Sequence, residues 1–218
     1  MAPIGHRTRG APATEGGTIR WARLYDLGTT CLSFGRLSAL RRKLLERAGI
    51  APGERILDVG CGPGRLTILA GMVAGPSGEA YGIDPGPEMI GLARRNAMRA
   101  GVKVRFDVAA IERLPYSDDY FDVVLSSLML HHLPDDLKRR GLSEVRRVLK
   151  LGGRFVAVDF GATPGEGLGH ILCMLGLRRG WDHAERLCEL LGEQGLEAVE
   201  MGPTGHRGLA FVQGRKPA

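Results

Sequence analysis

The stretch "ILDVGCGPGRL", residues 56–66, joins an apolar run to a helical pattern through three glycines at alternate positions. Residues 56–59 have the composition of a buried strand, and residues 65–73 that of a helix. Glycine lets a loop backbone approach a ligand closely, and the helix that follows offers N–H donors at its first turn. A strand, a glycine loop and a helix in this order predict a nucleotide-type binding site.

The spacing of the glycines separates several kinds of cofactor. Gly60, Gly62 and Gly64 form G-x-G-x-G, whereas the dinucleotide fingerprint G-x-G-x-x-G requires glycine at position 65, where Arg65 stands. A phosphate-binding P-loop requires G-K-[ST], which is absent. An NAD or ATP site is therefore disfavoured, but a lone glycine loop does not decide the question.

Working outward from this loop, strands and helices alternate along the chain. The predicted strands are residues 56–59, 79–83, 103–107, 121–126, 154–160, 196–201 and 208–213. The predicted helices are residues 37–48, 65–73, 87–100, 134–149 and 182–194. This alternation predicts an α/β fold with a doubly wound, mostly parallel sheet. Only "GPTGHR" separates the last two strands, which is too short for a crossover helix, so we expect an antiparallel pair at one edge.

The length and composition indicate one soluble domain. A chain of 218 residues with 44% hydrophobic and 25% charged residues has an ordinary globular composition. Residues 1–18 are rich in Gly, Pro, Ala and Thr and lack periodicity, so we expect a disordered tail. Residues 19–218 are predicted to form a single domain, with helices over residues 19–50 as an N-terminal cap.

Charge and cysteine content restrict the class of partner. The net charge of +6 comes largely from arginines along predicted helices, without interleaved aromatic residues, so no nucleic-acid partner is expected. The four cysteines have neither disulfide nor metal-ligand spacing, and no signal peptide precedes the domain. We therefore expect a cytoplasmic protein without a metal site. Its apolar runs are shorter than the roughly 20 residues that span a bilayer.

Asp84 supplies the second indication of the ligand. It ends the second predicted strand, in "YGIDPGPEM", where a carboxylate accepts hydrogen bonds from the two hydroxyls of a ribose. An aspartate at a strand end is also common as a turn or cap residue. Together with a loop unsuited to pyrophosphate, Asp84 favours an adenosine without phosphates.

Four segments of the sequence resemble the motifs of a known family. "ILDVGCGPG", "GIDPGPEMI", "IERLPYSDDYFDVVLSSLMLHHL" and "EVRRVLKLGGRFVAVDF" resemble, in order and spacing, the motifs of class I S-adenosylmethionine-dependent methyltransferases. The most similar branch contains the ubiquinone/menaquinone C-methyltransferases and the bacterial phospholipid N-methyltransferases. The resemblance implies a Rossmann-like, seven-stranded sheet with an antiparallel edge strand, and S-adenosyl-L-methionine as cofactor.

The resemblance also implies roles for individual residues. The residues expected at the cofactor's methionine part are Asp58, Gly60, Cys61, Gly62 and Gly64. Those expected at its ribose and adenine are Asp84, Pro85, Met89, Ile111 and Glu112. Ser126 is expected near the amino-acid end. Two departures from the family pattern are Ala110, where an aspartate commonly contacts the adenine amino group, and Leu151, where a turn proline is usual. Adenine recognition would then depend on backbone groups and apolar packing.

Three residues are candidates for a catalytic role. His131 and His132 follow the fourth strand, where the family meets its substrate, so either is a candidate base or orienting group; polar packing is the alternative. Tyr25 resembles the tyrosine of an N-terminal helix that closes over the cofactor, and a core aromatic residue is equally consistent. Residues 161–180 resemble a cap insert that lines an apolar pocket, lies peripherally on membrane lipid, or packs in the core.

These observations favour methyl transfer to a small, hydrophobic or amphipathic acceptor such as a quinone, a lipid or a secondary metabolite. A nucleic-acid methyltransferase is an alternative, although the Asn/Asp-Pro-Pro-Tyr motif of base N-methylation is missing at "SSLMLHHL". A non-catalytic S-adenosylmethionine-binding protein is another. The three cysteines outside the glycine loop do not match the pattern of arsenite methyltransferases.

Overall fold

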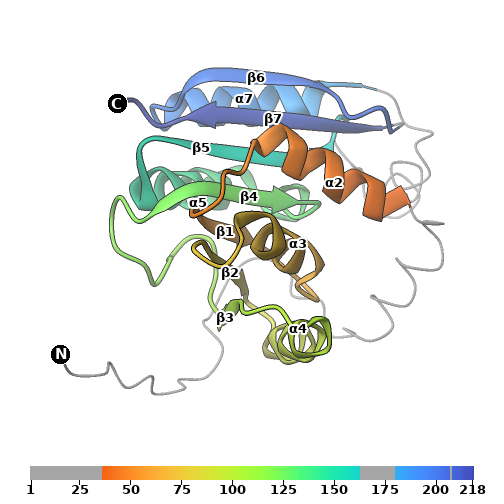
Figure 1. Ribbon diagram of the computed structural model, residues 1–218. Helices are drawn as coiled ribbons and strands as arrows, with labels where there is room; N and C mark the ends of the chain where they lie inside the picture. Colours follow the sequence, from red (N-terminus) through yellow and green to blue (C-terminus); the bar gives the residue numbers. More distant parts are fainter. Residues whose placement is uncertain (1–35, 163–179, 207) are drawn as a thin grey trace.

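A seven-stranded sheet forms the centre of the structure, with strand order β3-β2-β1-β4-β5-β7-β6 (Figure 1). The computed structural model describes residues 36–162, 180–206 and 208–218. The strands are β1 (Arg55–Val59), β2 (Glu79–Asp84), β3 (Arg105–Val108), β4 (Phe121–Ser127), β5 (Leu149–Phe160), β6 (Glu197–Pro203) and β7 (Leu209–Arg215). Strands β1 to β5 are parallel, and β7 is antiparallel to both β5 and β6. The predicted parallel sheet with an antiparallel pair at one edge is confirmed.

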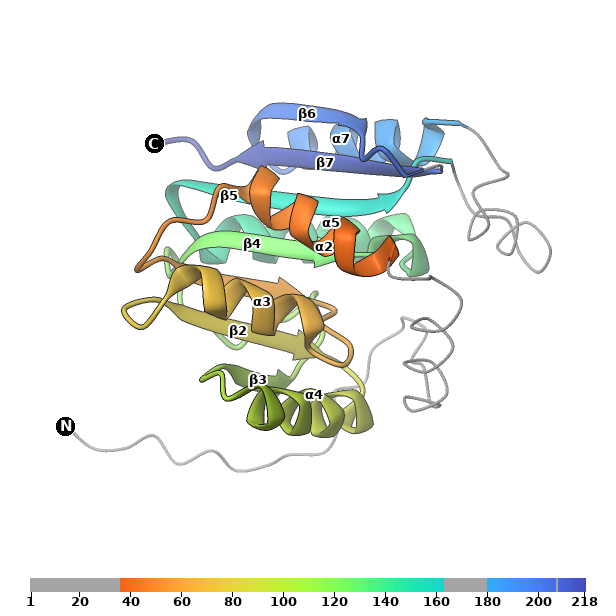
Figure 2. The same cartoon turned by 45° about the vertical axis from the view of Figure 1, so that its right-hand side comes forward.

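Helices cover both faces of the sheet. They are α2 (Arg36–Ala48), α3 (Arg65–Ala74), α4 (Pro87–Ala100), α5 (Asp135–Val148) and α7 (Asp182–Glu193), with a 3-10 turn, η1 (Leu130–His132). Figure 2 shows α2, α3 and α4 in front of the sheet and α5 and α7 behind it. The sheet therefore has no solvated face along its central strands, which explains why those strands are apolar on both sides.

The core has two main layers because side chains alternate across each strand. On β4, Val123 and Leu125 pack with Leu44 of α2 on one face. Val124 lies on the other face, with Leu142 of α5. This double burial fixes the register of β4, because a shift by one residue would exchange its two faces.

The predicted boundaries differ most at the start of β5. This strand begins at Leu149 rather than at residue 154, and α5 ends at Val148. Leu149 pairs with Phe121, and Arg154 pairs with Val123, so residues 150–153 bulge out of the ladder. The sequence "KLGG" obscured this continuity because its glycines indicate a turn. Strand β3 begins at Arg105, two residues later than predicted.

The carboxyl ends of the parallel strands lie at one side of the sheet. The arrowheads of β2, β4 and β5 in Figure 2 point to that side, and that of β7 points away from it. In a doubly wound sheet this side carries the ligand site. Tyr25, the predicted tail at residues 1–18 and almost all of the predicted insert lie outside the described residues, so their roles stay predictions.

Candidate functional site

The glycine loop joins β1 to α3 in a backbone conformation that favours glycine. Gly60, Gly62 and Gly64 have φ angles of 72°, 51° and 77°. A Cβ atom at Gly60 would lie 2.3 Å from Cγ of Met129, whereas one at Gly62 would meet no atom within 4 Å. Gly60 therefore lets the turn after β4 sit against the loop, and Gly62 faces space that no atom of the described residues fills within 4 Å.

Cys61 holds the loop in place through its backbone. Its N–H donates to the carbonyl of Ile83 at 2.8 Å, and its own carbonyl accepts from Gly64 N at 2.9 Å. The thiol is buried, and burial together with the charges of Asp58 and Asp84 raises its pKa well above the usual range. Cys61 is a packed loop residue in the protonated form, not a reactive thiolate.

Asp58 is a buried carboxylate just before the loop. It is 1% exposed, and Oδ2 accepts a hydrogen bond from Thr67 Oγ1 at 2.7 Å. Burial raises the pKa of Asp58 to about 6, although the Thr67 hydrogen bond and the charge of Arg41 on α2 act in the opposite direction. A buried carboxylate with this pKa is ready to be stabilised by a cationic group of a ligand.

Asp84, at the end of β2, bridges two turns. Oδ2 accepts from Gly62 N at 3.1 Å, and Oδ1 accepts from Gly86 N at 2.8 Å. Burial raises the pKa of Asp84 against the effect of these two bonds. Each carboxylate oxygen can accept a further hydrogen bond, as a pair of neighbouring hydroxyls would provide. Pro85 is half-buried, and Met89 is buried at the start of α4.

The segment after β3 passes beside Asp84. Ala109 N donates to the carbonyl of Asp84 at 3.2 Å, which brings the following residues to the predicted adenine side. Ile111 is buried, and a Cβ at Gly141 of α5 would lie 2.8 Å from its Cγ1, so the Ile111 side chain packs in the core. Glu112 is half-buried. The backbone of this segment, rather than the Ile111 side chain, is what a ligand beside Asp84 would meet.

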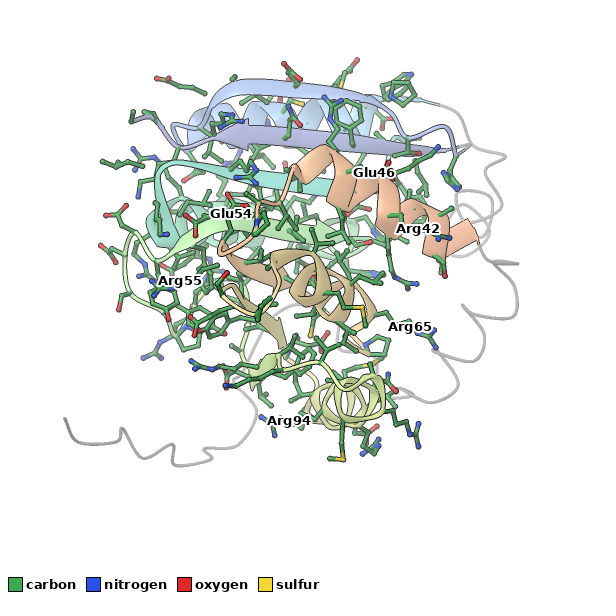
Figure 3. All side chains as sticks on the ribbon, viewed as in Figure 1. Arg42, Glu46, Glu54, Arg55, Arg65 and Arg94 are labelled. Atoms are coloured by element: carbon green, nitrogen blue, oxygen red, sulfur yellow. The ribbon has the colours of Figure 1, made fainter. Side chains whose placement is uncertain are left out.

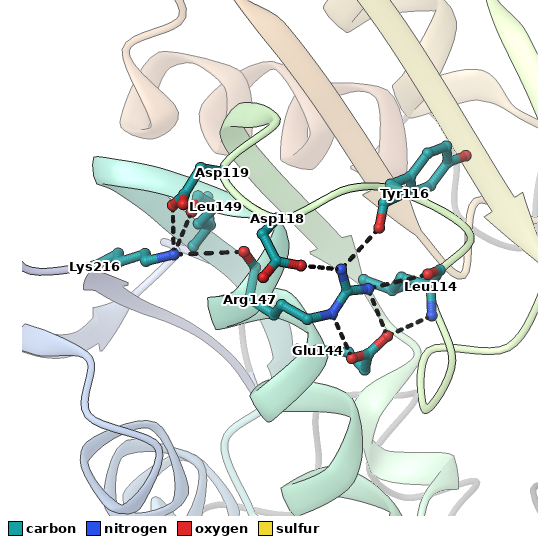
Figure 4. Close-up of polar contacts among 8 residues, drawn as sticks. All are labelled: Leu114, Tyr116, Asp118, Asp119, Glu144, Arg147, Leu149 and Lys216. Carbon is teal, nitrogen blue, oxygen red and sulfur yellow. Dashed lines mark hydrogen bonds and ion pairs between the residues drawn. The ribbon is translucent and has the colours of Figure 1, made fainter.

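Arg147 of α5 binds the backbone of Leu114 and Tyr116, farther along the segment that follows β3 (Figure 4). Its guanidinium donates to the carbonyls of Leu114 (3.1 Å) and Tyr116 (2.8 Å). It also pairs with Glu144 (2.7 Å), whose other carboxylate oxygen accepts from Leu114 N at 2.8 Å. We had not predicted this cluster, although the i, i+3 spacing of Glu144 and Arg147 in "EVRRVLK" is a signal for an ion pair on a helix.

Ser126 lies near the end of β4, between β1 and β5. It pairs in register with Val59, the residue before Gly60, and with Ala157. Ser126 is 1% exposed, and its Oγ has no hydrogen-bond partner among the described residues. Because buried hydroxyls normally have a partner, this oxygen beside the glycine loop suits a polar group of a ligand.

His131 is paired with a carboxylate at the end of β5. Its Nδ1 lies 2.6 Å from Oδ1 of Asp159, and its backbone N–H donates to Oδ2 at 3.2 Å. The two side chains are 4% and 1% exposed. Burial would raise the pKa of Asp159, but its hydrogen bond with His131 and the His131 charge outweigh burial, so the pKa lies below the usual value. The adjacent His132 ring lies 3.9 Å from that of His131, and the His132 residue is exposed.

His183, in the first turn of α7, completes this group. Its backbone N–H donates to the carbonyl of Gly161 at 3.0 Å, which joins α7 to the end of β5. The side chain is buried, and Nε2 has no hydrogen-bond partner in the described part of the chain. Burial lowers the pKa of His183, although Asp159 opposes that effect. Sequence reasoning missed both Asp159 and His183, because only the fold brings them to His131.

Positive charge flanks this side of the sheet. Figure 3 shows Arg42 on α2 and Arg65 at the start of α3 on the side where the parallel strands end, whereas Glu54 and Arg55 lie at the opposite side. Cationic residues near the glycine loop favour a ligand with an anionic group. No group of three or more His, Cys, Asp or Glu side chains in the described ranges is arranged to hold a metal ion. Among the same residues, every helix is too short or too polar to cross a bilayer.

Comparisons with known proteins find methyltransferases. Residues 56–153 match a family model described as a methyltransferase domain. An arsenite methyltransferase of Halobacterium salinarum is 35% identical over 160 residues, which cover 72% of this chain and 40% of the relative. The ubiquinone/menaquinone biosynthesis C-methyltransferase UbiE of Burkholderia mallei is 34% identical over 136 residues, which cover 62% and 55%. The chain thus spans about half the length of the curated relatives it matches.

Solved structures share the fold at lower sequence identity. A SAM-dependent methyltransferase from Aquifex aeolicus superposes with a TM-score of 0.69 at 20% identity, covering 91% of this chain and 99% of the other. Geranyl diphosphate C-methyltransferase from Streptomyces coelicolor, solved with Mg2+, geranyl diphosphate and S-adenosyl-L-homocysteine, gives a TM-score of 0.67 at 14% identity, covering 82% and 79%.

Proposed function

Because this chain belongs to the class I S-adenosylmethionine-dependent methyltransferases, we propose that it transfers a methyl group to a small, hydrophobic or amphipathic organic acceptor. The observation that carries the proposal is Asp84, whose two oxygens each hold one loop N–H and keep capacity for a ribose hydroxyl. Quinones, lipids and secondary metabolites are the acceptor classes that we favour.

The residues at the site fit S-adenosylmethionine. Asp84 would hold the ribose, Asp58 would face the ammonium group of the methionine part, and the open side of Gly62 would admit the chain between them. When bound, this cofactor supplies a methyl group already activated on a sulfonium. The protein then has mainly to hold the acceptor atom in line with that methyl group, which is a positioning task.

Two of the four cysteines are described, and neither is a fully exposed thiol. Trivalent arsenic is a soft centre that thiolates bind, and the Halobacterium salinarum relative is named for its methylation. Burial raises the pKa of both Cys61 and Cys188. Neither thiol is therefore an effective thiolate at neutral pH. The other two cysteines of the sequence lie outside the described residues.

Calorimetry and a turnover screen test the proposal. S-adenosylhomocysteine should bind to the purified protein, and extracts of lipids, quinones and phenols should sustain its release from S-adenosylmethionine. Absence of binding at millimolar cofactor would refute the proposal. Binding without turnover on any pool would favour a non-catalytic binding protein, and turnover on RNA alone would favour a nucleic-acid methyltransferase.

A further inference from the structure

We propose that one edge of the sheet, formed by α4 and β3, docks on an anionic membrane surface. The residues of this surface, called the basic edge below, are the exposed Arg94, Arg95, Met98, Arg99 and Lys103. The partner is a bilayer with negatively charged phospholipid headgroups, which attract the cations while Met98 enters the headgroup layer. The inference goes beyond methyl transfer and does not depend on which acceptor is methylated.

The charge of the chain is unevenly distributed between the two edges of the sheet. Residues 87–106, which form α4 and the first half of β3, contain five Lys or Arg and one acidic residue, Glu88. Residues 182–203, which form α7 and β6, contain six Asp or Glu and one arginine, Arg186. The strand order places β3 at one edge and β6 at the other (Figure 1). The protein therefore has a positive and a negative edge, and this asymmetry orients it on a charged surface.

Cations from neighbouring helices neutralise part of the negative edge. Arg47 of α2 lies 3.0 Å from the carboxylate of Glu200, and Arg139 of α5 lies 2.8 Å from that of Glu193. These ion pairs leave less negative charge for the basic edge of a second copy of the chain. Head-to-tail association of two copies is therefore a weaker explanation of the basic edge than an external anionic partner.

The cations of the basic edge are not neutralised in this way. In the described part of the chain, Arg94, Arg95, Arg99 and Lys103 form no ion pair with a carboxylate. Arg94 donates instead to the carbonyl of Phe106 at 2.6 Å, which joins α4 to β3 and leaves the charge of Arg94 uncompensated. Arg95 and Arg99 are four positions apart on α4, where like charges repel each other and weaken a helix. An anionic surface would reduce this repulsion and supply the missing negative charge.

Met98 distinguishes a lipid surface from other polyanions. It is 80% exposed, more than any other large hydrophobic residue in the described ranges. It lies three positions after Arg95 and next to Arg99, away from the buried face of α4. Cations around an exposed apolar side chain are typical of peripheral membrane surfaces, where the cations contact headgroups and the apolar group is inserted between them. A phosphate backbone of nucleic acid would neutralise the cations without burying Met98.

The basic edge is a fixed part of the domain. Ala93 and Ala97 on the inner face of α4 pack with Phe106 of β3 in one buried cluster. The helix ends at Gly101, whose φ of 67° lets the chain turn, and Lys103 follows two residues later. The backbone that carries the cations is therefore ordered before a partner binds, which lowers the entropic cost of association.

Vesicle flotation with the full chain tests the proposal. Vesicles of phosphatidylcholine alone are compared with vesicles that also contain about 40% phosphatidylglycerol, at about 50 mM and about 500 mM NaCl. Wild type should float with the anionic vesicles at low salt and with neither kind at high salt, because salt screens exposed charges. Equal binding to the two kinds of vesicle, or no binding to the anionic vesicles at low salt, would overturn the proposal.

Two variants locate the surface. Arg95→Gln/Arg99→Gln/Lys103→Gln keeps good helix formers on α4 and should lower the partition coefficient on anionic vesicles about fivefold per charge, or about a hundredfold in all. Met98→Ser should lower it severalfold and leave its salt dependence unchanged, because the insertion of an apolar group is lost and no charge is removed. Unchanged binding of Met98→Ser would overturn the assignment to lipid, and it decides the test even if the triple variant is unstable.

A matched control removes the same charge from α5, on the other face of the sheet (Figure 2). Arg139→Gln/Arg140→Gln/Arg146→Gln should lower the partition coefficient less than about threefold. A loss as large as that of the basic-edge variant would attribute binding to net charge and overturn the proposal. Binding of a single-stranded RNA oligomer without binding of anionic vesicles would favour nucleic acid and overturn it as well. Calorimetry with S-adenosylhomocysteine checks each variant, and its affinity should equal that of wild type, because the basic edge is separate from the glycine loop.

Discussion

Three carboxylates, two of them buried and one half-buried, lie at the same side of the sheet, and the pKa shift of one is opposite to that of the other two. Burial raises the pKa values of Asp58 and Asp84, beside the glycine loop. The pKa of Asp159, at the end of β5, lies below its usual value because burial is outweighed by His131 together with His183 and the Phe160 N–H. Among the described residues, Asp58 and Asp84 accept hydrogen bonds from neutral groups only and can accept more, whereas Asp159 is paired with an imidazole. The difference separates loop carboxylates that keep capacity for a ligand from a histidine–carboxylate pair that is already formed.

The largest expected effect is a pH dependence that Asp58 imposes on stability. Its pKa is about 6 in the folded protein, against an ordinary value of 3.8, so the folded state holds the proton more tightly. This contribution is fully present below about pH 4 and is lost as pH rises through 6, with a magnitude of up to about 3 kcal/mol. Urea unfolding of wild type and Asp58→Asn at pH 4.5 and pH 7 should show wild type gaining relative to the variant at the lower pH. An identical pH response of the two proteins would contradict the assignment.

Removal of the His131 imidazole should raise the pKa of Asp159, as burial does for Asp58. His131→Ala leaves a buried carboxylate without its imidazole, which should destabilise the protein by about 2 kcal/mol at pH 7. The loss should shrink toward pH 4.5, because Asp159 then becomes protonated. Unfolding curves at the two pH values measure both effects. A loss that stays constant with pH would mean that Asp159 is not ionised beside His131.

Asp84 should matter for binding more than for stability. Asp84→Asn keeps the shape of the side chain but weakens charge-assisted hydrogen bonds to a ribose, so affinity for S-adenosylhomocysteine should fall about tenfold, or about 1.4 kcal/mol. Titration calorimetry measures the change. Adenosine should lose as much affinity as S-adenosylhomocysteine does, since both carry the ribose; loss for only one of them would argue against contact with the hydroxyls.

Loss of an exposed carboxylate should have almost no effect on the free energy of unfolding by comparison. Asp136 pairs with Arg140 at 3.5 Å on the surface of α5, with both side chains more than half exposed. Asp136→Asn should change the free energy of unfolding by less than about 0.5 kcal/mol and leave cofactor affinity unaltered. A larger effect would show that loss of any carboxylate perturbs this domain and would weaken the contrast among the buried ones.

The conformation of the glycine loop and its contact with Asp84 were largely predictable, because they depend on short segments. Gly60, Gly62 and Asp84 belong to turns whose conformation depends on neighbouring residues, so their spacing carried the information. The pair of His131 and Asp159 depends on a contact between distant residues. Asp159 is 28 positions from His131, and no local pattern marks the pair. The same reason explains why the sequence offered His131 and His132 equally, whereas the fold gives the carboxylate to His131.

The contacts of Arg147 lead to an expectation for the heat capacity change and the rate of cofactor binding. Because Arg147 already holds the carbonyls of Leu114 and Tyr116, the segment that borders the predicted adenine side does not have to become ordered on binding. Preorganisation of this kind lowers the entropic cost of association. We therefore expect the heat capacity change on binding adenosine to be small, and the association rate to depend on diffusion into the site rather than on folding of a loop.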